Sequence, residues 1–160
     1  MSPRNDRPVR GMTLGEYVQH RNGSPLGGAG SIRQMVSRSL GAGSFAEFWR
    51  HWNPIWGYGL KRFVHDPLRR FVPSAVAGLA TFVVSGALHD GAVTLLRGST
   101  THVMTPWFLL LGIGAYVGRL RGMDLSRSTW RWRATINLAY LGGSLATVLL
   151  LGSLIGPNAP

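Results

Sequence analysis

The apolar residues of this chain gather into long runs in its second half, whereas polar and charged residues interrupt them in its first half. Three runs are apolar enough to form lipid-facing helices, at about residues 74–96, 106–120 and 134–155. The first and third match the roughly 20 residues that a helix needs to cross a bilayer, and the middle run is short. The pattern predicts an all-α membrane protein with a three-helix transmembrane region over residues 74–160.

Residues 1–43 are rich in Arg, Gly, Ser and Pro. This composition predicts a flexible basic segment with one short amphipathic helix, over residues 31–40. Ser44 followed by Glu47 has the spacing of a capping box, so a second helix is expected to begin there. Pro54 should end or kink that helix, because proline lacks an amide donor and disfavours helical geometry in the residue before it.

Aromatic residues recur at helical spacing after Ser44, at Phe45, Phe48, Trp49 and Trp52. A helix with rings on one face and Arg50 on another is typical of the membrane interface. We therefore expect an interfacial amphipathic helix and a loop over residues 44–73. Packing of the same rings into a protein core is the alternative interpretation.

Lysine and arginine are segregated along the chain. Eleven of the 17 precede residue 74, one lies in the loop 97–105, five lie between Arg119 and Arg133, and none follows. The positive-inside rule then places the N-terminus in the cytoplasm and the C-terminus outside the cell membrane. Because this bias also accounts for the net charge of +11, no nucleic-acid partner is expected.

Metal and cofactor chemistry has little support in the sequence. The chain contains no cysteine, which excludes disulfides and thiolate ligands. Its histidines do not have the spacing of metal ligands. We therefore expect no metal site and no cofactor.

The most informative residue is His89, because it lies with Asp90 inside an apolar run. An ionisable group at this depth is costly and usually marks a functional site. A helix over residues 74–96 places His89 in a stripe of small and polar residues with Gly78, Thr81 and Ser85. Since imidazole is unfavourable in hydrocarbon, this stripe should face protein or a wet cavity.

Two motifs precede and contain this histidine. The first is Phe48-Trp49-Arg50-His51-Trp52-Asn53, and the second is Ser85-Gly86-Ala87-Leu88-His89. Their order resembles the core of the membrane-bound O-acyltransferase family, whose sterol and diacylglycerol branch carries a Phe-Trp-Arg-x-Trp-Asn signature followed by a Ser-x-x-x-His element. The resemblance covers about 45 of the 160 residues.

The resemblance implies transfer of an acyl group from acyl-CoA to a hydroxyl acceptor. His89 would be the general base, since a neutral imidazole can take a proton from an alcohol at physiological pH. Asn53 would orient the substrate or donate to the developing oxyanion. The alternative role for Asn53 is to end a helix before proline. The other candidate substrate-binding residues are Trp52 and Ser85 from the two motifs and the basic residues Arg50, Lys61 and Arg62.

Two further interpretations remain open. Members of the resembled family usually have many more spans, so the resemblance implies completion by self-association or by a partner membrane subunit. Small residues at GxxxG spacing, such as Gly114 and Gly118, are consistent with close helix contacts of either kind. The chain could instead be a non-catalytic membrane subunit or scaffold that packs against a larger partner. A weaker alternative is a protein that binds anionic membrane lipids through its basic first half.

Overall fold

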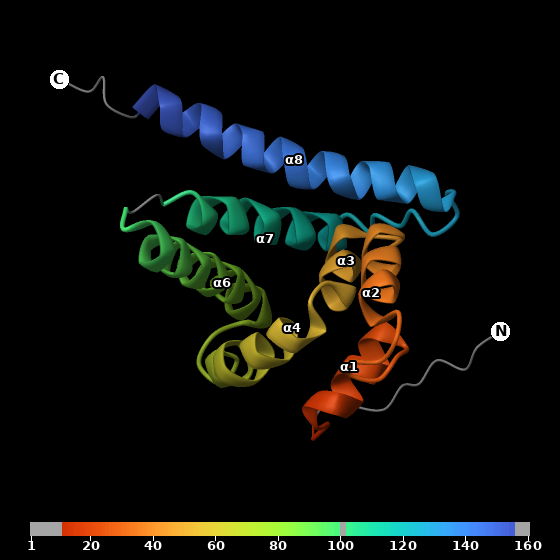
Figure 1. The fold of residues 1–160 in the computed structure, drawn as a ribbon. Helices are drawn as coiled ribbons and strands as arrows, with labels where there is room; N and C mark the ends of the chain where they lie inside the picture. Colours follow the sequence, from red (N-terminus) through yellow and green to blue (C-terminus); the bar gives the residue numbers. More distant parts are fainter. Residues whose placement is uncertain (1–10, 100–101, 156–160) are drawn as a thin grey trace.

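The computed structural model describes residues 11–99 and 102–155, and this part of the chain consists of helices joined by short loops (Figure 1). The elements in chain order are α1 (Leu14–Asn22), α2 (Ser31–Leu40), α3 (Phe45–His51), α4 (Pro54–Leu60), the π-helical turn η1 (Lys61–His65), α5 (Asp66–Leu68), α6 (Ser74–Arg97), α7 (Met104–Leu120) and α8 (Trp130–Ile155). The all-helical prediction is confirmed for the described residues.

The helices form two groups, as Figure 1 shows. The long helices α6 and α7 form a hairpin, and α8 runs along α7. The short helices α1 to α4 lie to one side of this group, where α3 packs against α7 and α2 packs against α8. The turn η1 returns the chain to the start of α6 and contacts it. This arrangement places α1, α3, α4 and α6 around a common space.

The first half of the chain is more ordered than the composition predicts. Thr13 and Glu16 form a reciprocal capping box that starts α1, and Tyr17 and Val18 of this helix are buried. The expected helix over residues 31–40 is confirmed as α2. Within the segment 1–43, which was expected to be flexible, the structure thus has two helices, and α1 buries apolar side chains against its neighbours. Residues 1–10 lie outside the described part.

The break between α3 and α4 follows the sequence closely. The Ser44 hydroxyl accepts the Glu47 amide at 3.2 Å, as a helix start there requires. The Glu47 carboxylate accepts the amide of Gly43 at 2.9 Å. Helix α3 ends at His51, and Pro54 occupies the first turn of α4. The predicted helix boundaries on both sides of this break are confirmed.

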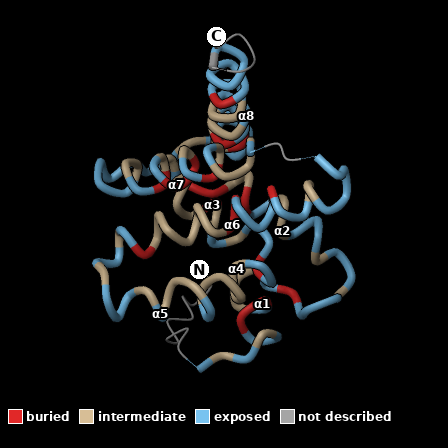
Figure 2. The backbone as a smooth tube through the Cα atoms, turned by 90° about the vertical axis from the view of Figure 1, so that its left-hand side faces the viewer, coloured by how far each residue is buried: buried red, intermediate tan, exposed pale blue. Residues whose placement is uncertain are grey.

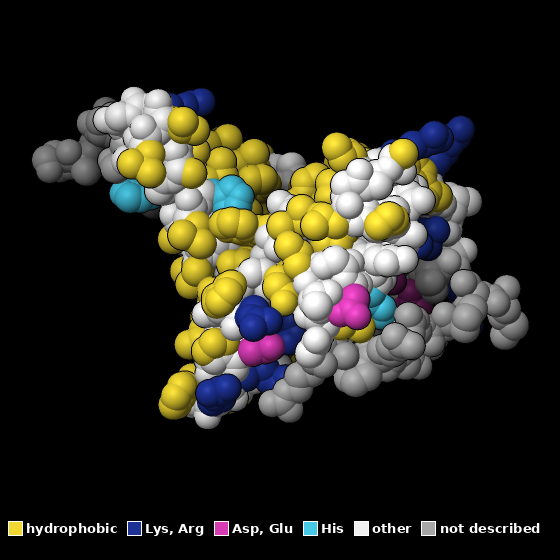
Figure 3. Space-filling view, turned by 60° about the horizontal axis from the view of Figure 1, so that its bottom comes forward, with side chains coloured by type: hydrophobic (Ala, Val, Ile, Leu, Met, Phe, Trp, Pro, Cys, Tyr) yellow, Lys and Arg dark blue, Asp and Glu magenta, His cyan; other side chains and the backbone are white. Residues whose placement is uncertain are grey.

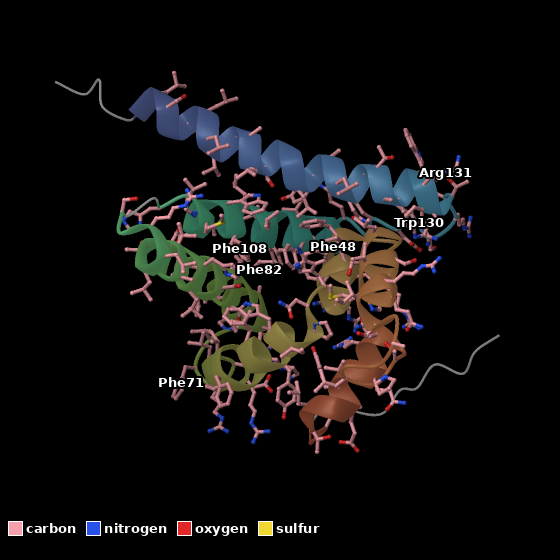
Figure 4. The ribbon with its side chains drawn as sticks, in the orientation of Figure 1. Phe48, Phe71, Phe82, Phe108, Trp130 and Arg131 are labelled. Carbon is pink, nitrogen blue, oxygen red and sulfur yellow. The ribbon has the colours of Figure 1, made fainter. Side chains whose placement is uncertain are left out.

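The aromatic stripe of α3 points mostly into the protein. Phe48 is 1% exposed, and Trp49 meets Phe82 of α6 edge-on at a centroid distance of 5.3 Å. Phe45 contacts Tyr140 of α8 at 4.3 Å. Figure 4 shows Phe48, Phe82 and Phe108 converging between α3, α6 and α7, and Figure 2 shows buried backbone in the same region. These three α3 rings are packed as the core interpretation predicts.

Within residues 11–99 and 102–155, two helices are long and apolar enough to cross a membrane. They are Ser74–Arg97 and the stretch Trp130–Leu154 of α8, and only 17% of the apolar window of each is buried. Most residues of these windows are therefore at least partly exposed. The expected runs 74–96 and 134–155 fall inside α6 and α8, although α8 begins earlier, at Trp130. The third predicted span, 106–120, falls in α7, whose 17 residues are at the short end of the length range for a span.

Helix α7 begins at Met104 because a side chain of α6 caps it. The Asp90 carboxylate accepts the backbone amides of Met104 at 2.9 Å and Thr105 at 2.8 Å, and also the Thr105 hydroxyl at 2.6 Å. Asp90 is only 5% exposed, so these bonds satisfy a buried carboxylate. The donors for this carboxylate are the amide groups at the start of α7, which have no partner within their own helix.

Small residues fit α7 against α8 at one point. The Tyr140 hydroxyl lies against Gly114, where a side chain would overlap it, and it donates to the Leu110 carbonyl oxygen at 2.6 Å. Gly142 and Gly143 of α8 have open space beside them. The close approach predicted from small residues therefore occurs at Gly114, within the chain.

Candidate functional site

A pocket of about 340 Å³ opens between the short helices and the α6–α7 hairpin. This volume falls within the range of small-molecule sites, about 300–1,000 Å³. Aromatic and apolar side chains form most of its wall. Its lining residues are Tyr17, Arg21, Ala46, Trp49, Arg50, Trp52, Asn53, Trp56, Gly57, Leu60, Lys61, His65, Gly78, Thr81, Phe82, Ser85, His89 and Phe108.

The wall contributed by α6 is the stripe predicted from the sequence. Gly78, Thr81, Ser85 and His89 all line the pocket. They follow one another at three- or four-residue intervals, which places them on one face of the helix. Over the 11 residues from Gly78 to His89 this face is about 16 Å long, at 1.5 Å per residue. The pocket is therefore an elongated groove along α6.

His89 is held in a defined tautomer. Its Nδ1 lies 2.7 Å from the carbonyl oxygen of Ser85. Because a carbonyl oxygen only accepts, Nδ1 carries the proton, and in the neutral ring Nε2 is the acceptor. The ring contacts Trp56 edge-on at 5.5 Å and Phe108 at 4.9 Å between centroids. His89 is thus an exposed imidazole in an aromatic setting, with Nε2 available to a hydroxyl group.

Asn53 lines the same pocket and also starts α4. Its Oδ1 accepts the Trp56 amide at 3.2 Å. Its φ of 39° lies in the left-handed region, which asparagine tolerates better than most residues. Since Oδ1 serves as the cap, the Nδ2 group is the part of the amide that can donate to a ligand. The helix-boundary role considered for Asn53 is present, and it leaves a donor for the pocket.

The two sequence motifs meet through a hydrogen bond that was not anticipated. The Trp56 indole Nε1 donates to the Ser85 hydroxyl at 2.9 Å. Ser85 is 2% exposed, so it supports the pocket wall from behind, whereas Trp52 is 39% exposed at the pocket. The structure therefore brings Asn53, Ser85, Trp52 and His89 to one place, as the motifs predict.

The three candidate basic residues have different environments. Arg50 lines the pocket and is exposed. Lys61 also lines it, but its ammonium group donates to both carboxylate oxygens of Asp66, at 2.7 and 2.6 Å. Arg62 is not among the lining residues and donates to the Tyr58 hydroxyl at 3.0 Å. The structure therefore brings Arg50 and Lys61 to the pocket wall and does not bring Arg62 there.

Asp66 also contacts a second pocket residue. His65 Nδ1 lies 3.1 Å from the same carboxylate. Although burial would raise the pKa of Asp66, the hydrogen bonds from Lys61 and His65 outweigh it and hold this pKa below its usual value. Asp66 thus stays ionised and compensates the charge of Lys61.

Several pocket residues were not predicted from the sequence, among them Tyr17, Arg21, His65 and Phe108. Tyr17 and Arg21 come from α1, which the composition did not predict. The short capping-box pattern of Thr13 and Glu16 was the available signal. Phe108 comes from α7, which packs against α6, so its place in the pocket depends on tertiary structure.

No protein-family model, curated protein or solved structure matches this chain. The fold and the pocket define an all-helical protein with two helices that could span a membrane and a largely apolar pocket containing an accessible imidazole. The acyltransferase resemblance consequently rests on the two motifs and on their meeting in one pocket.

Proposed function

We propose that this protein is an integral membrane acyltransferase that moves an acyl group from acyl-CoA to a hydroxyl acceptor. The observation that carries the proposal is the meeting of His89 and Asn53 in one pocket. These residues come from two motifs that the resembled family also carries in this order. The apolar wall suits an acyl chain, and Nε2 of His89 is oriented for proton transfer by the bond from Nδ1 to the Ser85 carbonyl.

The proposed reaction uses both polar groups. Nε2 of His89 takes the proton of the acceptor hydroxyl as the oxygen attacks the thioester carbonyl carbon. The Nδ2 group of Asn53 donates to the oxyanion that develops on that carbonyl, which an amide can do without a change of charge. The carbon–sulfur bond then breaks, and the CoA thiolate leaves and takes up the proton. The product is an ester of the acceptor.

The proposed membrane orientation follows from charge and exposed rings. Five cations lie between Arg119 and Arg133 and would share the cytoplasmic side with the basic first half, so α6, α7 and α8 would each cross. Phe63 and Phe71, before α6, are 75% and 84% exposed. Phe71 points away from the core in Figure 4, and Figure 3 shows Lys and Arg side chains gathered near exposed hydrophobic ones. Rings among cations suit the headgroup region.

Transfer of a labelled acyl group tests the proposal. Protein purified in detergent or nanodiscs is incubated with labelled acyl-CoA and a panel of alcohols, and ester formation is measured. His89→Ala should abolish transfer, and His20→Ala serves as the matched control because His20 lies outside the pocket. Full turnover by His89→Ala, or no transfer by the unaltered protein with any acceptor, would contradict the proposal.

Asn53→Asp separates catalysis from folding. Aspartate is as good a helix cap as asparagine and keeps the acceptor for the Trp56 amide. It replaces the Nδ2 donor by an oxygen and so removes the proposed oxyanion contact. We expect the melting temperature to stay close to that of the unaltered protein while kcat falls about 100-fold or more. An unchanged kcat would remove Asn53 from the mechanism.

A further inference from the structure

The basic residues at the pocket are not equivalent. Arg21, Arg50, Lys61 and His65 line it, and no aspartate or glutamate is among its lining residues. Lys61 and His65 both bond to Asp66. No hydrogen bond or ion pair from the guanidinium groups of Arg21 and Arg50 is found in residues 11–99 and 102–155. The uncompensated positive charge of the pocket therefore comes from Arg21 and Arg50.

Arg21 is held firmly although its guanidinium group lacks an acceptor. Its backbone carbonyl oxygen accepts His51 Nδ1 at 2.8 Å and Arg38 Nη1 at 3.4 Å. Its Cζ lies 5.1 Å from the centroid of the Tyr17 ring, which fixes the plane of the group. The two hydrogen bonds join α1 to α2 and α3, and the guanidinium group lies over Tyr17, which also lines the pocket.

The Nε atom of Arg21 is buried and has no hydrogen-bond partner in the described structure. A buried polar atom without a partner is unfavourable, and a ligand or an ordered water can complete such a site. A guanidinium group offers a planar fork of donors that matches the oxygens of a phosphate group. Arg50 adds a second cation from α3 to the same pocket.

We propose that Arg21, together with Arg50, binds a phosphate group of a molecule that enters the pocket. This inference deepens the proposed function, because it assigns a phosphate-bearing substrate to the end of the pocket formed by α1 and α3. The phosphate can belong to coenzyme A or to the headgroup of a phospholipid, and both have the same recognition chemistry. Helix α1 is then part of the binding site.

Direct binding tests this inference without turnover. Protein in neutral detergent is titrated with coenzyme A in one arm and with micellar phosphatidic acid in the other, and binding is followed by calorimetry and tryptophan fluorescence. Arg21→Gln should weaken binding about tenfold or more in the arm that carries the natural ligand. Arg69→Gln is the matched control, since it removes the same charge from an exposed residue outside the pocket.

Comparison of the two titrations identifies the molecule that supplies the phosphate group. Weakened binding of coenzyme A alone identifies the acyl donor, and weakened binding of phosphatidic acid alone identifies a lipid headgroup. Equal affinities of Arg21→Gln and Arg69→Gln, or no binding of either probe by the unaltered protein, would overturn the inference. Should Arg21→Gln not fold, Arg21→Lys replaces it, because lysine keeps the charge and loses the fork. Affinity of Arg21→Lys equal to that of the unaltered protein would also overturn it.

The outcome is distinguishable from that of the proposed reaction. If His89→Ala retains full turnover while Arg21→Gln loses binding, the results support the phosphate site and contradict the acyl-transfer mechanism. If His89→Ala is inactive while Arg21→Gln binds normally, the results support the mechanism and contradict the phosphate site.

Discussion

Trp56 of α4 donates its indole proton to the Ser85 hydroxyl of α6 across 2.9 Å, and this bond joins the two sequence motifs. The residues are 29 positions apart, and the Trp56 ring also contacts His89 edge-on. The bond holds α4 against α6, the helix that carries His89. Because Asn53 caps α4, the bond also links Asn53 to the same helix.

A double-mutant cycle measures this link. Trp56→Phe keeps a ring beside His89 and removes the donor, whereas Ser85→Ala removes the acceptor. We expect a coupling free energy of about 0.5–1.5 kcal/mol between the two changes, as for an ordinary side-chain hydrogen bond. Denaturant unfolding of the four proteins in the same detergent checks it. Strictly additive losses would show that the bond does not contribute to stability.

Removing the Asp90 carboxylate, which caps α7, should lower the free energy of unfolding more than removing the exposed Asp124 carboxylate. Asp90→Ala leaves the amides of Met104 and Thr105 without their acceptor, and we expect a loss of about 2–3 kcal/mol in the free energy of unfolding. Asp90→Asn should lose less, because it keeps one acceptor oxygen. Asp124→Ala is the control, since Asp124 makes a similar turn with Ser126 on the exposed surface. Equal losses for Asp90→Ala and Asp124→Ala would argue against a special role for the buried cap.

Gly114 is packed against Tyr140, whereas Gly143 has open space beside it, so substitutions at the two positions should have different effects on stability. Gly114→Ala forces a methyl group into the Tyr140 hydroxyl and should lower stability by about 1–3 kcal/mol. Gly143→Ala meets open space, and alanine favours helix by up to about 1 kcal/mol, so it should be neutral or slightly stabilising. Thermal unfolding of both variants in one detergent compares them. A neutral Gly114→Ala would show that the contact between α7 and α8 can shift without cost.

The pH dependence of stability should include a contribution from His51. Burial lowers the pKa of this imidazole below 6.5, and the nearby Arg38 and Arg21 act in the same direction, although the Arg21 carbonyl and Glu47 oppose them. The unfolded chain therefore binds a proton more readily than the folded one. This contribution is complete above about pH 6.5 and is lost as the pH falls toward the lower folded-state pKa.

His51→Asn isolates this contribution, because asparagine can keep a donor for the Arg21 carbonyl without titrating. Between pH 7.5 and 5.5 the unaltered protein should lose more stability than the variant does, measured by unfolding in the same detergent. Identical losses in the two proteins would show that His51 does not control this part of the pH profile.

The sequence predicts the helices whose signals are local. The run at 74–96 corresponds to α6, Ser44 starts α3, and Pro54 follows its end, because apolar length, a capping hydroxyl and a proline each act on neighbouring residues. Likewise, the placement of Ser85 and His89 on one face of α6 follows from helical periodicity alone. Helix α1 was missed because it is short and mostly polar, and its stability comes from packing Tyr17 and Val18.

The parts of the site that were not predicted depend on contacts between distant segments. Arg21 reaches the pocket through bonds from residues 17 and 30 positions away. From the sequence, Lys61 and Arg50 were equal candidates for binding the substrate. In the structure, the ion pair with Asp66 compensates the charge of Lys61. Which cation remains available is decided by tertiary structure, so composition and spacing do not reveal it.

The carboxylate of Asp90 also has a consequence for biogenesis. If α6 entered a bilayer by itself during synthesis, it would bring an ionised group without donors into the lipid, which is unfavourable. The amides that satisfy this group follow only 14 and 15 residues later. Integration is therefore favoured when both arms of the hairpin have emerged, and a nascent chain that ends before residue 104 should be retained less efficiently in the membrane than one that ends after residue 120.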